Sequence, residues 1–200
     1  MAGFGLIPTR HLSGAPYNGQ FNEYVHLAND SAAIFIGSPV KLTGIASPSG
    51  VESAFKNLPT VAVGTAGAAL VGVCVGVKPV TGDSAVYCVG STLRTIYVAD
   101  DPDLLFEIQE DAAGGAIALA SAGLNANMTS ESGNTTTGQS TVELDSSDVA
   151  TDTTGQFRVH RLIEKPNIAA LATSAPLTRW EIIIAEHQLG PATTGVGTDI

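Results

Sequence analysis

The acidic residues that gather around position 100 are the strongest candidates for chemistry in this chain. Asp100-Asp101-Pro102-Asp103 is followed by Glu107, Glu110 and Asp111. Clustered carboxylates are the ligands that a hard cation such as Ca²⁺ requires. The EF-hand spacing fails, however, because Leu105 stands where an oxygen ligand is needed. Asp-Pro is also typical of a turn, which would leave the acids at opposite ends of one strand, about 20 Å apart. We therefore predict a turn whose aspartates accept backbone N–H groups, and no metal site.

Other catalytic patterns fail on spacing. No lysine follows a glycine, which excludes the P-loop, and the nucleophile elbow Gly-x-Ser-x-Gly is absent. His11, His26, His160 and His187 are far apart and form no metal-ligand pair at helix or strand spacing. We interpret them as surface or interface histidines. The sequence thus predicts no catalytic residue, no metal ion and no cofactor.

The composition favours contacts with other protein chains. Of the 200 residues only 14% are charged, and the net charge is −10. A weakly charged surface loses water at little cost, which suits large protein interfaces. Bases this sparse predict no nucleic-acid partner and no anionic membrane partner. The apolar run at residues 61–77 contains four glycines and lacks aromatic or basic flanks, so we do not expect it to span a membrane.

Short β-branched runs separated by turn residues predict about nine or ten strands and almost no helix. The clearest are residues 21–27, 70–77, 86–98, 104–109, 157–163 and 180–185. This pattern predicts an all-β, mainly antiparallel fold, either a β-sandwich or a β-barrel. Glycines inside residues 61–77 indicate bulges or close backbone approach. Cys74 and Cys88 fit two buried thiols, although they could also face each other on neighbouring strands.

The chain divides by composition into three parts. Residues 1–20 are rich in turn residues and predict an extended N-terminal arm, too irregular for a helix or a core strand. Residues 21–190 form the β-rich domain, with a polar loop or hairpin region at about 125–156 that is either mobile or ordered by a neighbouring subunit. Residues 166–173 fit one or two helical turns, and residues 191–200 a flexible tail.

Four segments carry a resemblance to a known family. They are residues 14–19 (GAPYNG), 33–42 (AIFIGSPVKL), 71–77 (VGVCVGV) and 97–110 (YVADDPDLLFEIQE). In this order they resemble the small structural proteins of tailed bacteriophages that serve as capsid cement, or head-decoration, proteins. The resemblance covers about residues 3–111 and is strongest at the Asp-Asp-Pro-Asp segment and the strand after it.

The resemblance implies a non-enzymatic virion protein, a homotrimer on the outer capsid surface whose partner is the major capsid protein. The arm would contact the capsid through its apolar residues Phe4, Leu6, Ile7, Leu12 and Tyr17. The core and trimer scaffold would be led by Val71, Val73, Phe106, Trp180 and Ile182. Deletion of residues 2–20 would then abolish capsid binding and leave the trimer intact. Two alternatives stay open: another virion part, such as a tail, fibre or head–tail component, or a β-sandwich glycan-binding or hydrolytic module.

Overall fold

Strands supply almost all of the regular structure. The computed structural model describes residues 3–46, 58–111, 113–130, 132–151, 154–163 and 178–190. In these residues the one helical element is the single 3₁₀ turn Leu119–Ser121 (η1), and no helix is long and apolar enough to cross a membrane. The predicted all-β class is therefore confirmed. The expectations for residues 166–173 and 191–200 lie outside the described residues.

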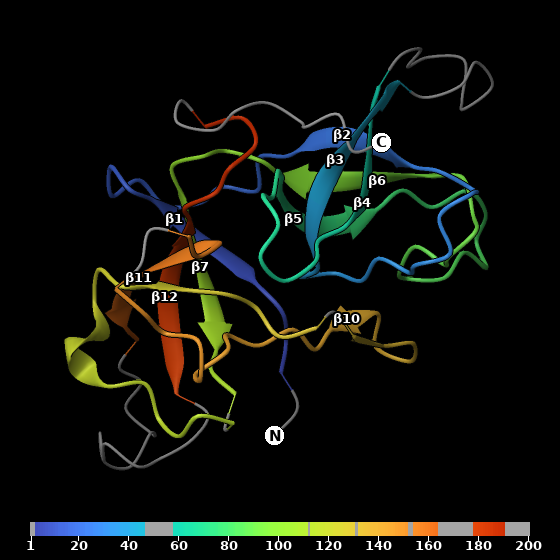
Figure 1. Ribbon diagram of the computed structural model, residues 1–200. Coiled ribbons are helices and arrows are strands. Elements are labelled where there is room, and N and C mark those ends of the chain that lie inside the picture. Colours follow the sequence, from blue (N-terminus) through green and yellow to red (C-terminus); the bar gives the residue numbers. More distant parts are fainter. Residues whose placement is uncertain are drawn as a thin grey trace.

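Five strands close into a barrel, at the upper right in Figure 1. They are β2 (Asn22–His26), β3 (Pro39–Ala46), β4 (Pro59–Val63), β5 (Gly72–Val77) and β6 (Arg94–Ala99), in the spatial order β2-β4-β3-β5-β6. All neighbours are antiparallel except β2 and β4. β-Branched and other apolar side chains fill the interior, among them Val40, Val61, Val71, Ile96 and Val98. Closure removes the exposed sheet edges on which other chains could pair.

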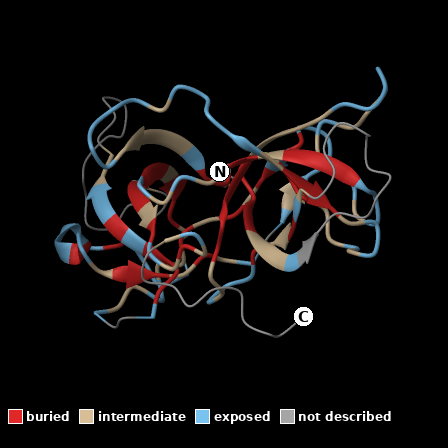
Figure 2. Cartoon of the chain, turned by 90° about the horizontal axis from the view of Figure 1, so that it is seen from above, coloured by how far each residue is buried: buried red, intermediate tan, exposed pale blue. Residues whose placement is uncertain are grey.

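The other large sheet has the order β1-β7-β12-β11-β8. Its strands are β1 (Ile7–His11), β7 (Leu104–Gln109), β12 (Arg179–Ile184), β11 (Phe157–Leu162) and β8 (Asn125–Ala126), all antiparallel. The inner face carries Phe106, Trp180 and Ile182, all buried. Val73 of β5 and Ala99 of β6 belong to the same core cluster, so the sheet packs against the outside of the barrel. Figure 2 shows the buried segments running through both bodies and between them.

The N-terminal segment contributes a strand to this sheet, whereas the sequence predicted an extended arm too irregular for a core strand. β1 pairs with β7 with Ile7 opposite Glu107, and Leu6 is 1% exposed in the sheet core. The chain then turns back, and the Tyr17 N–H donates to the Thr9 carbonyl at 3.1 Å. The segment that follows β1 in the chain thus covers part of the outer edge of β1. Deletion of residues 2–20 would remove a strand and a core side chain, so it cannot test partner binding alone.

The polar region around residues 125–156 packs on its own chain. β9 (Gly133–Asn134) and β10 (Gln139–Ser140) form a small hairpin, below the barrel in Figure 1. A Cβ at Gly133 would clash with the ring of Phe35 on the β2–β3 connection, which shows how closely the hairpin approaches that connection. Met128, Val142 and Leu144 are buried in the sheet core. Its few apolar side chains therefore anchor this serine- and threonine-rich region without a neighbouring subunit.

Glycine in β5 allows close backbone approach, as the sequence predicts. A Cβ at Gly72 would meet the carbonyl oxygen of Ala99 on β6 at less than van der Waals distance. The β5–β6 register also shifts between Cys74 and Gly76, which is a β-bulge. Val73 stays paired with Pro39 of β3 and Ala99 of β6, and its side chain lies in the core shared with the sheet.

A buried arginine holds the long β5–β6 connection. Arg94 is 6% exposed, and its guanidinium donates to the carbonyl oxygens of Lys78, Ala85 and Tyr87 at 3.0–3.1 Å. A guanidinium offers five N–H donors in a fixed planar arrangement, so one side chain can hold the loop at three carbonyl groups. This cation serves the fold and is not available to a partner.

Candidate interaction surfaces

The acidic segment forms the turn between β6 and β7, as predicted. Oδ1 of Asp101 accepts the backbone N–H of Asp103 at 2.8 Å, and Oδ2 lies 3.1 Å from Nδ1 of His11. The Asp100 carboxylate accepts from the Asn22 amide at 2.9 and 3.0 Å and from the Tyr24 hydroxyl at 2.6 Å. Burial, and then this hydrogen bond, raise the pKa of Tyr24 well above its ordinary value. The aspartates thus tie the barrel and the sheet together.

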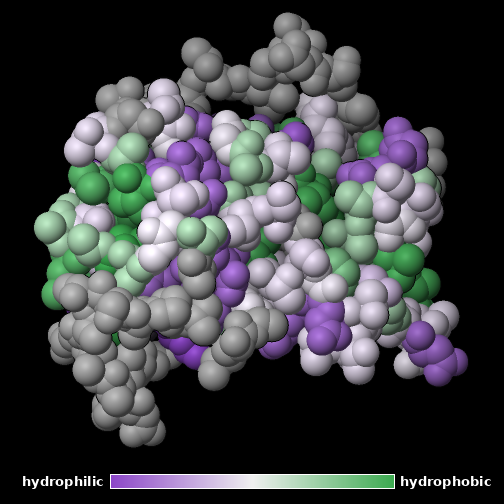
Figure 3. Space-filling model, turned by 60° about the horizontal axis from the view of Figure 1, so that its bottom comes forward, coloured by the Kyte–Doolittle hydropathy of each residue, from purple (hydrophilic) through white to green (hydrophobic). Residues whose placement is uncertain are grey.

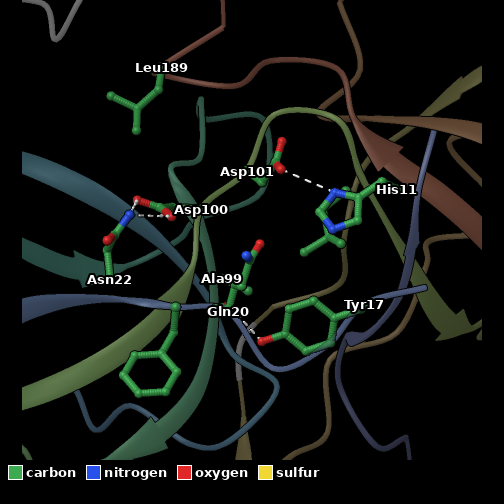
Figure 4. Close-up of a pocket in the computed structure, with 10 residues that line it drawn as sticks. His11, Tyr17, Gln20, Asn22, Ala99, Asp100, Asp101 and Leu189 are labelled. Carbon is green, nitrogen blue, oxygen red and sulfur yellow. Dashed lines mark hydrogen bonds and ion pairs between the residues drawn. The ribbon is translucent and has the colours of Figure 1, made fainter. Parts of the chain in front are cut away.

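A cleft of about 510 Å³ opens beside this turn, at the junction of the barrel and the sheet (Figure 4). Asp100 and Asp101 lie along one wall. The aromatic residues Tyr17 and Phe21 and the aliphatic Leu189 line the rest, and Phe21 and Leu189 are about half exposed at 49% and 51%. The volume suits a side chain or a small ligand. We call this feature the acidic cleft.

The other acidic residues of the segment lie at the far end of β7 and have structural roles. Glu110 is fully buried and accepts from the Trp180 indole at 3.0 Å and from the Thr178 hydroxyl at 2.6 Å. Asp111 accepts the Ser146 hydroxyl at 2.6 Å. These acids therefore do not join the turn in a common cation site. In the part of the chain that the structure describes, no three His, Cys, Asp or Glu side chains gather in a way that could hold a metal ion.

Arginines gather on the outer face of the β1-β7-β12-β11-β8 sheet. Four of the five arginines of the chain lie there: Arg10, Arg158, Arg161 and Arg179. The two glutamates on this face are covered, with side chains 12% exposed at Glu107 and 3% at Glu181. The side chains of Arg10 and Arg161 are 28% and 60% exposed. The face, which we call the arginine face, therefore presents cations to solvent.

Glu181 is the centre of this face. Its carboxylate accepts from Arg10 at 2.8 and 2.9 Å and from Nε of Arg161 at 2.7 Å, and it lies 3.3 Å from Nδ1 of His160. The hydrogen bond from Arg10 and the nearby Arg161 lower the pKa of Glu181 to about 2, despite the opposing effect of burial. Glu107 lies directly across on β7, where two carboxylates would repel. Arg179 compensates by pairing with Glu107 at 2.7 Å.

The residues predicted to contact the capsid differ in their exposure. Leu6 faces the core, whereas Ile7 and Leu12 are 44% and 52% exposed. The ring of Phe4 stacks under the Arg179 guanidinium, 4.6 Å from its centroid. Phe4, Leu6, Ile7 and Tyr17 all line one groove of about 280 Å³. On the face in Figure 3, hydrophobic groups alternate with polar ones and form no single continuous patch.

The predicted core residues Val71, Val73, Phe106, Trp180 and Ile182 are all buried, at 1% exposure or less. Val71 lies inside the barrel and the other four lie in the sheet core.

Both cysteines are buried thiols that form no disulfide, which was the simpler of the two interpretations. Cys74 and Cys88 are fully buried and unlinked. Burial raises the pKa of Cys88 to about 11. A thiol that stays protonated at neutral pH is a poor nucleophile, so Cys88 gives no sign of catalysis.

The arginine face was missed by sequence reasoning because of a bulge. Strict alternation of Phe157, Val159 and Arg161 puts Arg161 on the apolar side of its strand. In the structure the β11–β12 register shifts between Val159 and Arg161, so that Arg161 lies opposite Glu181 on the outer face. The exposed pair Arg158 and His160 was a signal available in the sequence.

No protein-family model matches the chain, and no significant similarity links it to a characterised protein or to a solved structure. The groove, the acidic cleft and the arginine face are therefore the features from which a function can be argued.

Proposed function

We propose that the protein is a non-enzymatic capsid cement protein, which binds the outer surface of a tailed-phage head as a trimer and stabilises contacts between capsomers of the major capsid protein. The observation that carries the proposal is the groove formed by the N-terminal segment. Apolar side chains from residues 4–17 line it, and Ile7 stays 44% exposed at its rim. Leu12, on the same segment, is 52% exposed. When a partner surface covers exposed apolar side chains, the free energy of the complex is lowered.

Three further features support the proposal. The chain has an all-β fold with a closed barrel. Because few of its residues are charged, removal of water from its surface costs little free energy. The order of segments up to residue 111 resembles that of head-decoration proteins. Repetition of one weak contact across a symmetric shell would make binding effectively permanent through avidity.

Point substitutions test the proposal without removing β1. Ile7→Asn and Leu12→Asp place polar groups on exposed positions of the N-terminal segment, while Leu6 stays in the core. Asparagine is used at position 7 because an aspartate there would face Glu107 across the sheet. We expect both variants to fold and to lose co-sedimentation with phage heads that lack the protein. Val80→Asp is the matched control, because Val80 is 69% exposed on the distant β5–β6 connection. Full binding by Ile7→Asn and Leu12→Asp, or equal loss by Val80→Asp, would contradict the proposal.

Copy number separates this function from the alternative of a tail, fibre or head–tail component. A cement protein is expected at hundreds of copies per particle, since it repeats with the capsomers. Tail parts occur in tens of copies or fewer. Quantitative mass spectrometry of purified particles measures this ratio directly, and a low value would favour the alternative.

A further inference from the structure

The acidic cleft holds carboxylates that no lysine or arginine of the described residues neutralises. Among the described residues, Asp100 is bound by an amide and a hydroxyl, and Asp101 by a backbone N–H and the imidazole of His11. No described lysine or arginine reaches either carboxylate. The aromatic rings of Tyr17 and Phe21 also line the cleft. Carboxylates beside aromatic rings suit a guanidinium, which pairs with the former and stacks on the latter.

The arginine face holds the complementary charge. Its four arginines outnumber its two glutamates, although the whole chain has a net charge of −10. Arg158 is exposed on β11 and forms no ion pair or hydrogen bond with any described residue. It lies opposite Ile183, on the same side of the sheet as Glu181. The guanidinium of Arg158 is thus free to enter a site on another molecule.

We infer that the acidic cleft of one copy of this chain receives the Arg158 guanidinium of a second copy. The two features lie on different parts of the surface, so the contact is head-to-tail and a small number of copies can close it into a ring. A nucleic acid is a poor occupant of the arginine face, because its dense phosphates would be repelled by the other charges of the molecule. The inference deepens the proposed function, on which it rests only for the expectation of several copies.

Exchange of the two charges provides the test. Arg158→Glu reverses the cation, and Asp101→Lys reverses the cleft; each variant alone then opposes like charges. Combined in one chain, the two substitutions restore the contact in a ring of any size, because the carboxylate introduced on the arginine face of each copy meets the ammonium introduced in the cleft of the next. Lys41→Glu, on β3 of the barrel, is the control for net charge, because it changes the total by the same amount as Arg158→Glu.

Self-association is measured by sedimentation velocity of the purified full chain at low salt. We expect each single variant to associate roughly tenfold more weakly or worse, as for desolvated charge pairs in other interfaces. The double variant Arg158→Glu/Asp101→Lys should return to the wild-type value, and Lys41→Glu should change little. Asp101→Asn, which keeps the Oδ1 acceptor of the turn but removes the charge, should also weaken association.

Several results would overturn the inference. They are a wild-type protein that stays monomeric, an Arg158→Glu variant that associates normally, a double variant that does not recover, and an equal loss in Lys41→Glu. Repulsion between whole molecules alone predicts tighter association for Asp101→Lys, since that change reduces the negative net charge. No phage heads are used, so failure of the capsid proposal would appear separately, as self-association without binding to heads.

Discussion

Neutralisation of Glu181 should destabilise the protein by an amount that depends on pH. Its pKa falls from 4.5 to about 2 on folding, which corresponds to about 3 kcal/mol of stabilisation. The carboxylate is only 3% exposed, but its partners Arg10 and Arg161 are 28% and 60% exposed. Solvent around them weakens the interaction. We therefore expect Glu181→Gln to lower the free energy of unfolding by about 2 kcal/mol at pH 7.

The pH dependence identifies the cause. Because the folded-state pKa lies below the unfolded one, the stabilisation is complete above about pH 4.5 and is lost as the pH falls towards 2. Urea unfolding at a series of pH values should show a wide gap between wild type and Glu181→Gln at pH 7 that closes near pH 2. Glu186→Gln is the matched control, since burial raises the pKa of Glu186 and its neutralisation should cost nothing at pH 7.

Two results would refute this reasoning. A gap of the same size at pH 7 and near pH 2 would mean that Glu181 acts through packing and not through its charge. Equal stability of Glu181→Gln and wild type at pH 7 would mean that the cost of burying the carboxylate cancels its ion pairs.

Three further predictions concern the core, the β5–β6 connection and the thiols. Leu6→Ala should lower the free energy of unfolding, measured with a chemical denaturant, by about 2–5 kcal/mol. Ile7→Ala, at a position 44% exposed, should lower it by less than about 1 kcal/mol. Similar losses in the two variants would mean that the segment is not packed as described. Arg94→Lys should lower the melting temperature clearly, because an ammonium cannot satisfy three carbonyl oxygens in a plane, and a melting temperature equal to that of wild type would contradict the described contacts. Cys88 should react with iodoacetamide at pH 8 much more slowly in the native than in the urea-unfolded protein, as followed by mass spectrometry, since burial raises its pKa to about 11; equal rates would show that the thiol is accessible.

Local sequence patterns were enough to predict the fold class and most strand positions. The alternation at residues 104–109 became β7, and the β-branched run at 70–77 became β5, with its glycines at a close approach and a bulge. The Asp-Pro turn also formed where predicted. These features depend on neighbours in the chain, so a single sequence expresses them directly.

Features that depend on distant partners were not predictable in the same way. β1 has little alternation of its own and forms because β7, about a hundred residues later, offers it an edge. Its register also shifts between Pro8 and Arg10, which obscures the pattern. The polar region carries too few apolar residues to predict burial, yet Met128, Val142 and Leu144 enter the core formed by other strands. Tertiary contacts decide such segments.

The position of β1 in the sheet has a consequence for biosynthesis. The barrel strands β2–β6 form one uninterrupted stretch between β1 and β7, so the barrel can close while later residues are still being translated. β1 must wait for β7, which at ordinary elongation rates emerges about 5–20 s later. During that interval Leu6 and its neighbours are unshielded on the nascent chain. Chaperones that hold apolar segments at the ribosome exit would therefore act on the first strand of this protein, not on its barrel.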